Sequence, residues 1–244
     1  MTDLLAFGPH PDDLEIGLGG TLAKQAALGH TVGLCDLTRG EMSSNGTPER
    51  RQREAETARE VLGAAWRENL GLPDRAIGTG PDHTRLVVEL IRRVRPRAVA
   101  IPYWHDRHPD HQAAAAMLRD AVFNAKLKRY AAAGDPWQPA WVCYYFINDA
   151  GPASFVVDVS DYYDVKRKAL ACYASQFTRA SDRAETRLNS PVFNQLIESR
   201  DAQFGALAGV RFAEGIVVNE PVVREHLLKD AAPAARSAPP GGES

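Results

Sequence analysis

The 244-residue sequence has few cysteines and no long hydrophobic run, and each lack excludes a class of protein. Its three cysteines are widely spaced and form no CxxC pair, which argues against a disulfide framework or a cysteine zinc finger. We expect them to be small buried hydrophobic residues in a reducing cytoplasm. No apolar run approaches the roughly 20 residues that span a bilayer, and no secretory signal is expected at the N-terminus. We therefore predict a cytoplasmic protein with no membrane partner.

An excess of one charge is also lacking. Lys and Arg number 29 against 31 Asp and Glu, for a formal net charge of -2, and both signs are spread along the predicted helices. A nucleic-acid-binding protein would show a basic stripe or patch, so no nucleic-acid partner is expected. With 44% hydrophobic residues, the chain is long enough to bury a sizeable core.

What is present is an alternation of short apolar runs with longer segments of helical periodicity. This pattern is typical of βαβ units and a mostly parallel sheet, so we predict an α/β fold. We expect one domain over residues 1–229 and a disordered tail rich in Ala, Pro, Gly and Ser over 230–244. The predicted strands are 4–7, 31–37, 66–70, 98–101, 141–147 and 155–159, and the predicted helices are 17–28, 47–62, 86–94, 109–130, 161–174 and 191–207.

Two polar segments of similar design follow predicted strands. His10-Pro11-Asp12-Asp13 comes directly after the first strand, and His108-Pro109-Asp110-His111 lies shortly beyond the fourth. In open α/β sheets, ligands collect outside the carboxyl ends of strands where the strand order switches. If the first and fourth strands are neighbours, the two segments meet there. Either segment alone could be a capped turn or a helix start, but the occurrence of both favours a metal site.

We assign His10, Asp13 and His111 as the metal ligands. Catalytic zinc takes about three nitrogen or oxygen ligands from the protein and keeps a position for water, whose pKa it lowers to roughly 7. Zn2+ is the expected cofactor, although iron or manganese would also suit two imidazoles and a carboxylate.

The remaining polar side chains of these segments are candidates for catalysis. Asp12 is the candidate general base, because its neighbour is taken by the metal. His108 is expected to stabilise the oxyanion of the tetrahedral intermediate or to protonate the leaving amine. Asp110 would then fix the tautomer of His108.

The run Gly17-Leu18-Gly19-Gly20 lacks the full spacing of a dinucleotide-binding motif. Such a run indicates close helix packing or a mobile loop rather than a nucleotide site.

The two motifs resemble those of the LmbE-like, or PIG-L, family of zinc N-deacetylases. The stretch from Phe7 to Gly20, with its HPDDxE core and paired glycines, matches the first signature of the family, and HPDH matches the second. Other blocks resemble the branch that acts on N-acetylglucosaminyl malate in bacillithiol biosynthesis; these are residues 35–38, 43–47, 69–75, 106–107, 188–191 and 213–215. One departure is Arg39-Gly40, where a more variable or acidic pair is expected.

This resemblance implies a Rossmann-like three-layer α/β/α fold, the same metal and base residues, and a homo-oligomer, often a hexamer. It also places Arg51 facing the substrate, where a guanidinium could bind the carboxylates of a malate group bidentately. Arg50 or Arg53 could fill that role instead. Asn45 and Arg107 are further candidates for contacts to sugar or carboxylate.

The expected activity is removal of an acetyl group from an N-acetylglucosamine conjugate, with the malate conjugate as the leading substrate. The alternatives are free N-acetylglucosamine, a chitooligosaccharide or a mycothiol-type conjugate. A different class of function, a non-catalytic sugar- or nucleotide-binding module, would have no use for Asp12 and His108 beside the metal ligands.

Overall fold

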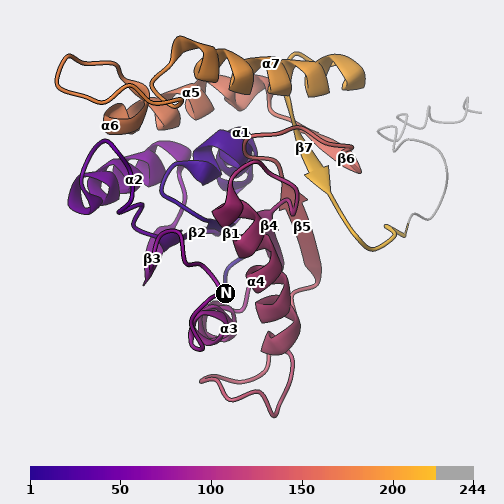
Figure 1. Ribbon diagram of the computed structural model, residues 1–244. Helices are drawn as coiled ribbons and strands as arrows, with labels where there is room; N and C mark the ends of the chain where they lie inside the picture. Colours follow the sequence, from indigo (N-terminus) through magenta and orange to yellow (C-terminus); the bar gives the residue numbers. More distant parts are fainter. Residues whose placement is uncertain (224–244) are drawn as a thin grey trace, which may run out of the picture.

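The computed structural model describes residues 1–223 (Figure 1). The tail predicted over 230–244 and the predicted domain end at residue 229 lie outside the described residues. No helix within 1–223 combines the length and the apolar character needed to cross a membrane.

One seven-stranded sheet forms the centre of the fold, in the order β3-β2-β1-β4-β5-β7-β6. β1 to β5 run parallel to one another, and β7 is antiparallel to both of its neighbours. The sheet is therefore mostly parallel, as predicted. The strands are β1 (Leu4–Gly8), β2 (Val32–Thr38), β3 (Trp66–Leu72), β4 (Ala98–Pro102), β5 (Trp141–Tyr145), β6 (Phe155–Asp158) and β7 (Ala213–Val217).

Helices cover both faces of the sheet, which confirms the predicted α/β class. α3 (His83–Val94) and α4 (Pro109–Ala125) pack on one face, and α1 (Asp13–Ala27) and α2 (Pro48–Leu62) pack on the other. Beyond α1 and α2 lie α5 (Tyr163–Cys172), α6 (Ala174–Phe177) and α7 (Pro191–Ala208), as Figure 1 shows.

The alternation of side chains along each strand produces two separate hydrophobic cores. In β1, Leu5 and Phe7 face α3 and α4, whereas Ala6 faces α1 and α2. All three are fully buried, because the first strand is covered on both faces and flanked by β2 and β4.

The glycine run lies inside α1, which begins at Asp13 rather than at the predicted residue 17. A Cβ on Gly17 would lie 2.3 Å from Cδ2 of Tyr145, and one on Gly20 would lie 2.7 Å from Cβ of Val159. The glycines therefore serve close helix packing, one of the two interpretations considered for the sequence.

Two further predictions of secondary structure were wrong. α4 ends at Ala125 instead of continuing to residue 130, because the side chain of Arg92 and the amide of Trp137 bind the Ala125 carbonyl. Strand β7 was missed altogether: it is a five-residue run that inserts between β5 and β6, and its pairing depends on strands far away in the sequence.

Candidate metal and active site

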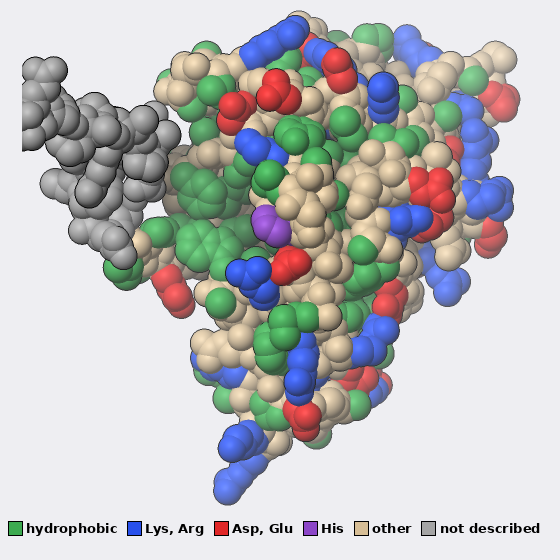
Figure 2. All heavy atoms as spheres, turned by 180° about the vertical axis from the view of Figure 1, so that it is seen from behind, with side chains coloured by type: hydrophobic (Ala, Val, Ile, Leu, Met, Phe, Trp, Pro, Cys, Tyr) green, Lys and Arg blue, Asp and Glu red, His purple; other side chains and the backbone are tan. Residues whose placement is uncertain are grey.

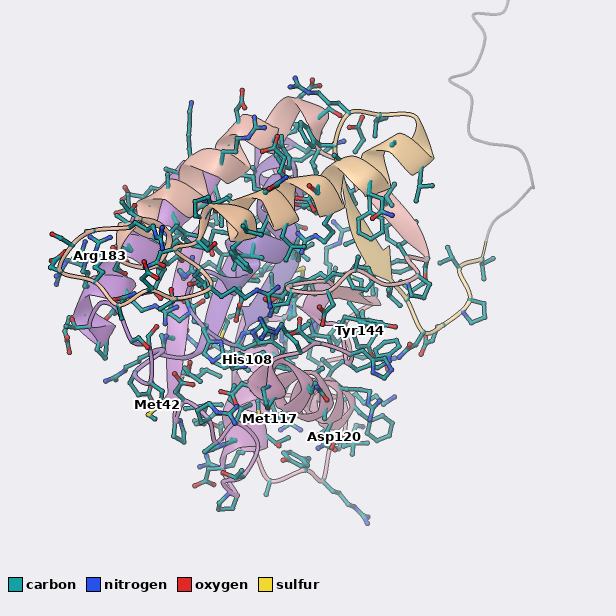
Figure 3. All side chains as sticks on the ribbon, turned by 45° about the horizontal axis from the view of Figure 1, so that its top comes forward. Met42, His108, Met117, Asp120, Tyr144 and Arg183 are labelled. Carbon is teal, nitrogen blue, oxygen red and sulfur yellow. The ribbon has the colours of Figure 1, made fainter. Side chains whose placement is uncertain are left out.

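The two motifs meet at the switch point of the sheet. β1 pairs directly with β4, so the loop after β1 and the start of α4 lie side by side. The ring centroids of His10 and His108 are 5.0 Å apart, those of His108 and His111 4.7 Å, and those of His10 and His111 5.6 Å. Figure 3 labels His108 near the middle of the molecule. The condition that β1 and β4 are neighbours is thus met.

The backbone conformation of the two motifs sets the direction of their side chains. Asp12 has a φ of 115°, a left-handed conformation unusual for a residue with a Cβ, and α1 starts at the next residue. His108 is the N-cap of α4, with Pro109 in the first turn as a proline pre-set for helical geometry. These turns point the side chains of Asp13 and His111 toward each other.

Asp13 is the point where the predicted ligands converge. Its Oδ2 lies 3.1 Å from Nδ1 of His10 and 3.3 Å from Nε2 of His111. All three residues are buried. One carboxylate oxygen thus lies close to a nitrogen from each of two imidazoles, and two imidazoles with one carboxylate are a donor set that fits a zinc ion.

The opposite nitrogen of each ring contacts a second carboxylate. Nε2 of His10 lies 3.3 Å from Oδ2 of Asp110 and 3.3 Å from Oδ1 of Asp74, and Nδ1 of His111 lies 3.0 Å from Oδ1 of Asp106. Metal-binding histidines characteristically donate their other ring N–H to such a group, which fixes the orientation of the ring. The surroundings of both rings therefore also fit metal ligation.

Two other groupings of donors come from the same side chains. Donor atoms of His10, His108 and His111 lie within 4.8 Å of one another, and so do those of His10, Asp74 and Asp110. The first grouping adds His108 to the two predicted histidines. The second is held by Arg75, whose backbone and guanidinium N–H groups both donate to Asp110.

The acidic surroundings favour positive charge at the rings. Burial lowers the pKa of His10, but hydrogen bonds to the carboxylates of Asp110, Asp13 and Asp74 more than compensate and raise it well above its usual value. For His111, burial is likewise outweighed, by the charge of Asp13 and by Asp106, and the pKa rises to about 9. The negative electrostatic potential of these carboxylates stabilises a cation in the site.

Asp12 is placed apart from the convergence point. Burial raises its pKa to about 7, against the opposing effect of the nearby Arg51 charge. Its Oδ2 accepts a hydrogen bond from Nη2 of Arg51 at 3.0 Å. Two adjacent aspartates thus have different partners and different environments.

Asp110 contacts His108 through its backbone instead of its carboxylate. The Asp110 amide donates to Nδ1 of His108 at 3.2 Å, while the carboxylate binds His10 and Arg75. Among the described residues, the contact of Asp110 with His108 that could fix its tautomer is therefore the backbone one. The tautomer is still determined, because an Nδ1 that accepts leaves the proton of the neutral ring on Nε2.

These groups open into a cavity of about 450 Å³. Arg107 lines it and is exposed, and its contact to the substrate stays a prediction. Asn45 is not among the lining residues: its amide pairs with the backbone N–H and carbonyl of Ala184 and so joins two loops. The lining residues are His10, Asp12, Asp13, Ile16, Met42, Ser43, Arg51, Asp74, Arg75, Arg107, His108, Pro109, His111, Asn148, Gln176, Arg187, Leu188 and Phe193.

Sequence reasoning missed Asp74, Asp106 and Asn148. Asn148 donates through its backbone and its side chain to Asp106, which holds His111. The only sequence signal for Asp74 and Asp106 was the family resemblance of the blocks that contain them, and Asn148 carried none.

Away from the cavity, acidic and basic side chains are interspersed over the face drawn in Figure 2.

The chain is similar in sequence to known deacetylases. The family model for PIG-L, GlcNAc-PI de-N-acetylase, matches residues 5–122. A diacetylchitobiose deacetylase from Thermococcus kodakarensis is 30% identical over 87% of this chain and 81% of that protein. A probable N-acetyl-alpha-D-glucosaminyl L-malate deacetylase 2 from Bacillus subtilis is 26% identical over 78% and 90%, respectively.

A solved structure agrees along almost the whole chain. The crystal structure of the conserved protein TT1542 from Thermus thermophilus is 38% identical and superposes with a TM-score of 0.84 over 92% of this chain and 97% of that chain. The motifs, the sheet order and the relatives lead to the same conclusion: this chain belongs to the PIG-L, or LmbE-like, family of deacetylases.

Proposed function

We propose that the chain hydrolyses the acetamide of an N-acetylglucosamine conjugate in a metal-dependent reaction, and that N-acetylglucosaminyl malate of bacillithiol biosynthesis is the substrate. One observation carries the chemistry. A single carboxylate oxygen of Asp13 meets a nitrogen from each of two buried imidazoles, beside a second aspartate that is left for proton transfer.

His10, Asp13 and His111 would hold the metal, with zinc as the ion that best suits this donor set. When bound, the ion supplies a Lewis acid that polarises an amide carbonyl and eases deprotonation of water. Asp110 and Asp74 orient His10, and Asp106 orients His111.

The protein's own groups move the protons. Asp12 accepts the proton of the attacking water, and its raised pKa suits a base that works near neutral pH. Nε2 of His108 donates to the oxygen of the tetrahedral intermediate or protonates the leaving nitrogen. A carbon–oxygen bond forms and the amide carbon–nitrogen bond breaks, which yields acetate and a free amine.

The malate conjugate is favoured by the Bacillus subtilis relative and by the arginines of the cavity. Arg107 and Arg187 line the cavity, and neither forms an ion pair within residues 1–223. Free guanidinium groups suit a carboxylate-bearing aglycone. The alternative is a neutral N-acetyl sugar, which the relative named as a diacetylchitobiose deacetylase supports. Free N-acetylglucosamine and a mycothiol-type conjugate remain as further alternatives.

The test is acetate release by chelated and metal-reloaded protein from three substrates: N-acetylglucosaminyl malate, diacetylchitobiose and free N-acetylglucosamine. We expect chelation to abolish turnover, zinc to restore it, and the malate conjugate to have the highest kcat/KM. Reloading with iron(II) or manganese in parallel identifies the metal that supports the fastest turnover.

The outcomes separate the parts of the proposal. Equal or better turnover of diacetylchitobiose would contradict the malate assignment and leave the chemistry intact. Full activity in the chelated protein would contradict metal dependence. Sugar binding without acetate release from any substrate would favour the non-catalytic module.

A further inference from the structure

Arg51 is inserted between two loops instead of reaching into open space. It lies in the first turns of α2, and its side chain is only 5% exposed. Nη2 donates to Oδ2 of Asp12 at 3.0 Å and also to the carbonyl of Pro11, and Nη1 donates to the carbonyl of Gly40 at 3.3 Å. The guanidinium therefore links α2 to the turn that carries Asp12.

These bonds leave Arg51 poorly suited to bind a carboxylate of the substrate. A guanidinium grips a carboxylate with two N–H groups on one edge, either Nε with Nη2 or Nη1 with Nη2. Both edges need Nη2, and Nη2 already donates to two acceptors of the protein. Nε is buried and has no hydrogen-bond partner among residues 1–223.

The backbone opposite Arg51 is shaped to admit the guanidinium. Gly40 has a φ of 65°, and a Cβ placed on it would lie 1.9 Å from Nη1 of Arg51. Only glycine can occupy this position while Arg51 stays where it is. This accounts for Gly40, the second residue of the Arg39-Gly40 pair at which the sequence departs from the expected family pattern.

The residue that Arg51 holds is strained. Asp12 has φ 115° and ψ -26°, and a residue with a Cβ stays in such a region only when surrounding contacts hold it there. Arg51 binds both sides of the Pro11–Asp12 linkage, through the Pro11 carbonyl and the Asp12 carboxylate. Oδ1 of Asp12 makes no hydrogen bond within residues 1–223, and Asp12 is one of the residues that line the cavity.

We propose that Arg51 is a positioning residue for Asp12, and that it does not read the charge of the substrate. This inference rests on the proposed function, in which Asp12 is the base. Arg51 fixes Oδ2 and the strained turn, so that Oδ1 faces the water to be deprotonated. Loss of Arg51 should then slow the chemical step equally for anionic and neutral acetamides.

The experiment compares Arg51→Gln, Arg51→Lys and Gly40→Ala with the wild-type enzyme, using the malate conjugate and diacetylchitobiose. Gly40→Ala displaces the guanidinium without removing it. Arg53, considered above as an alternative substrate contact, is exposed on the same helix and is not among the residues that line the cavity, so Arg53→Gln is the matched control for the arginine. Gly29→Ala is the matched control for the glycine, because it has φ 86° with nothing within 4 Å of the added Cβ.

We expect Arg51→Gln and Gly40→Ala to lower kcat by about 100-fold or more on both substrates, within the range for loss of a general base, with KM and metal content nearly unchanged. Arg51→Lys should recover part of that loss, because it keeps the charge but not the fork. The two controls should retain wild-type kcat.

A rise in KM confined to the malate conjugate, with kcat intact, would overturn the inference and show that Arg51 binds the carboxylates of the substrate. A crystal structure of Arg51→Gln provides a readout that does not depend on activity. If Asp12 kept its left-handed conformation and carboxylate position there, the inference would fail even if the wild-type enzyme turned over no substrate. Inactivity of the wild-type enzyme toward every substrate would instead count against the proposed function.

Discussion

At the scale of single residues, the site gives two neighbouring aspartates different surroundings. Asp13 lies between two imidazoles whose positive charge outweighs burial, so its pKa is held well below its usual range. Asp12 meets one guanidinium, and burial raises its pKa to about 7. One carboxylate is therefore suited to hold a cation and the other to exchange a proton.

This division predicts the behaviour of Asp12→Asn. The amide keeps the shape of the side chain and an oxygen for Arg51 but cannot accept a proton. We expect kcat for acetate release to fall by about 10²–10⁴-fold, the usual contribution of a general base. Bound metal, measured by elemental analysis, should stay at the wild-type level.

Asp161→Asn is the matched control, because Asp161 is exposed and its replacement removes the same charge. Wild-type turnover in Asp12→Asn would show that another group is the base. Loss of the metal would instead place Asp12 among the ligands.

At the scale of elements, α1 depends on the glycines that let it approach the sheet. A Cβ on Gly17 would overlap the ring of Tyr145 and lie 2.7 Å from the carbonyl oxygen of Phe146. The Tyr145 ring has little freedom to move, because it is fully buried and its hydroxyl donates to the Phe7 carbonyl. The start of α1, which carries Asp13, is therefore held directly against β5.

Gly17→Ala should destabilise the fold although alanine is the better helix former. Overpacking in a close-packed core costs about 1–3 kcal/mol, more than the roughly 1 kcal/mol that alanine gains in helix propensity. Urea denaturation measures the difference. Gln52→Ala places alanine at an exposed position of α2 and should leave the midpoint nearly unchanged. A stabilised Gly17→Ala would mean that α1 can shift away from β5.

At the scale of the whole molecule, one buried ionic network ties the outer helices to the sheet. Lys166 of α5 is fully buried and donates to Asp201 of α7 at 2.6 Å and to Glu214 of β7 at 2.7 Å. Glu214 in turn accepts the backbone N–H groups of Gly20 and Thr21 in α1. Lys166 therefore links α5, α7 and β7 directly, and Glu214 extends the network to α1.

Lys166→Met should lower the free energy of unfolding by about 3–5 kcal/mol, because it leaves Glu214 buried without a cation and leaves Asp201 with Arg200 alone. Lys168→Met is the matched control: Lys168 is exposed on the same helix, so its loss should change stability by less than about 0.5 kcal/mol. Chemical denaturation of both variants checks this. Equal midpoints would show that the carboxylates find other partners or take up protons.

The sequence by itself determined the fold class and the family to which the two motifs belong. Periodicity and apolar runs are local properties, so most strands and helices could be read from short windows. The placement of two polar motifs after strands was enough to predict that His10, Asp13 and His111 come together, because parallel strands end at one edge of a sheet.

Only the tertiary structure decided which side chains become partners across long separations. The insertion of β7, the contacts of Asp74 and Asp106 to the histidines, and the pairing of Arg51 with Asp12 all depend on the order of strands and on the paths of loops. An arginine in an RRQRE run looks like a surface residue, and local pattern carries no information about a partner 39 residues away. Burial and pairing are properties of the packed molecule, and they determine whether a polar group binds a cation, transfers a proton or positions a neighbour.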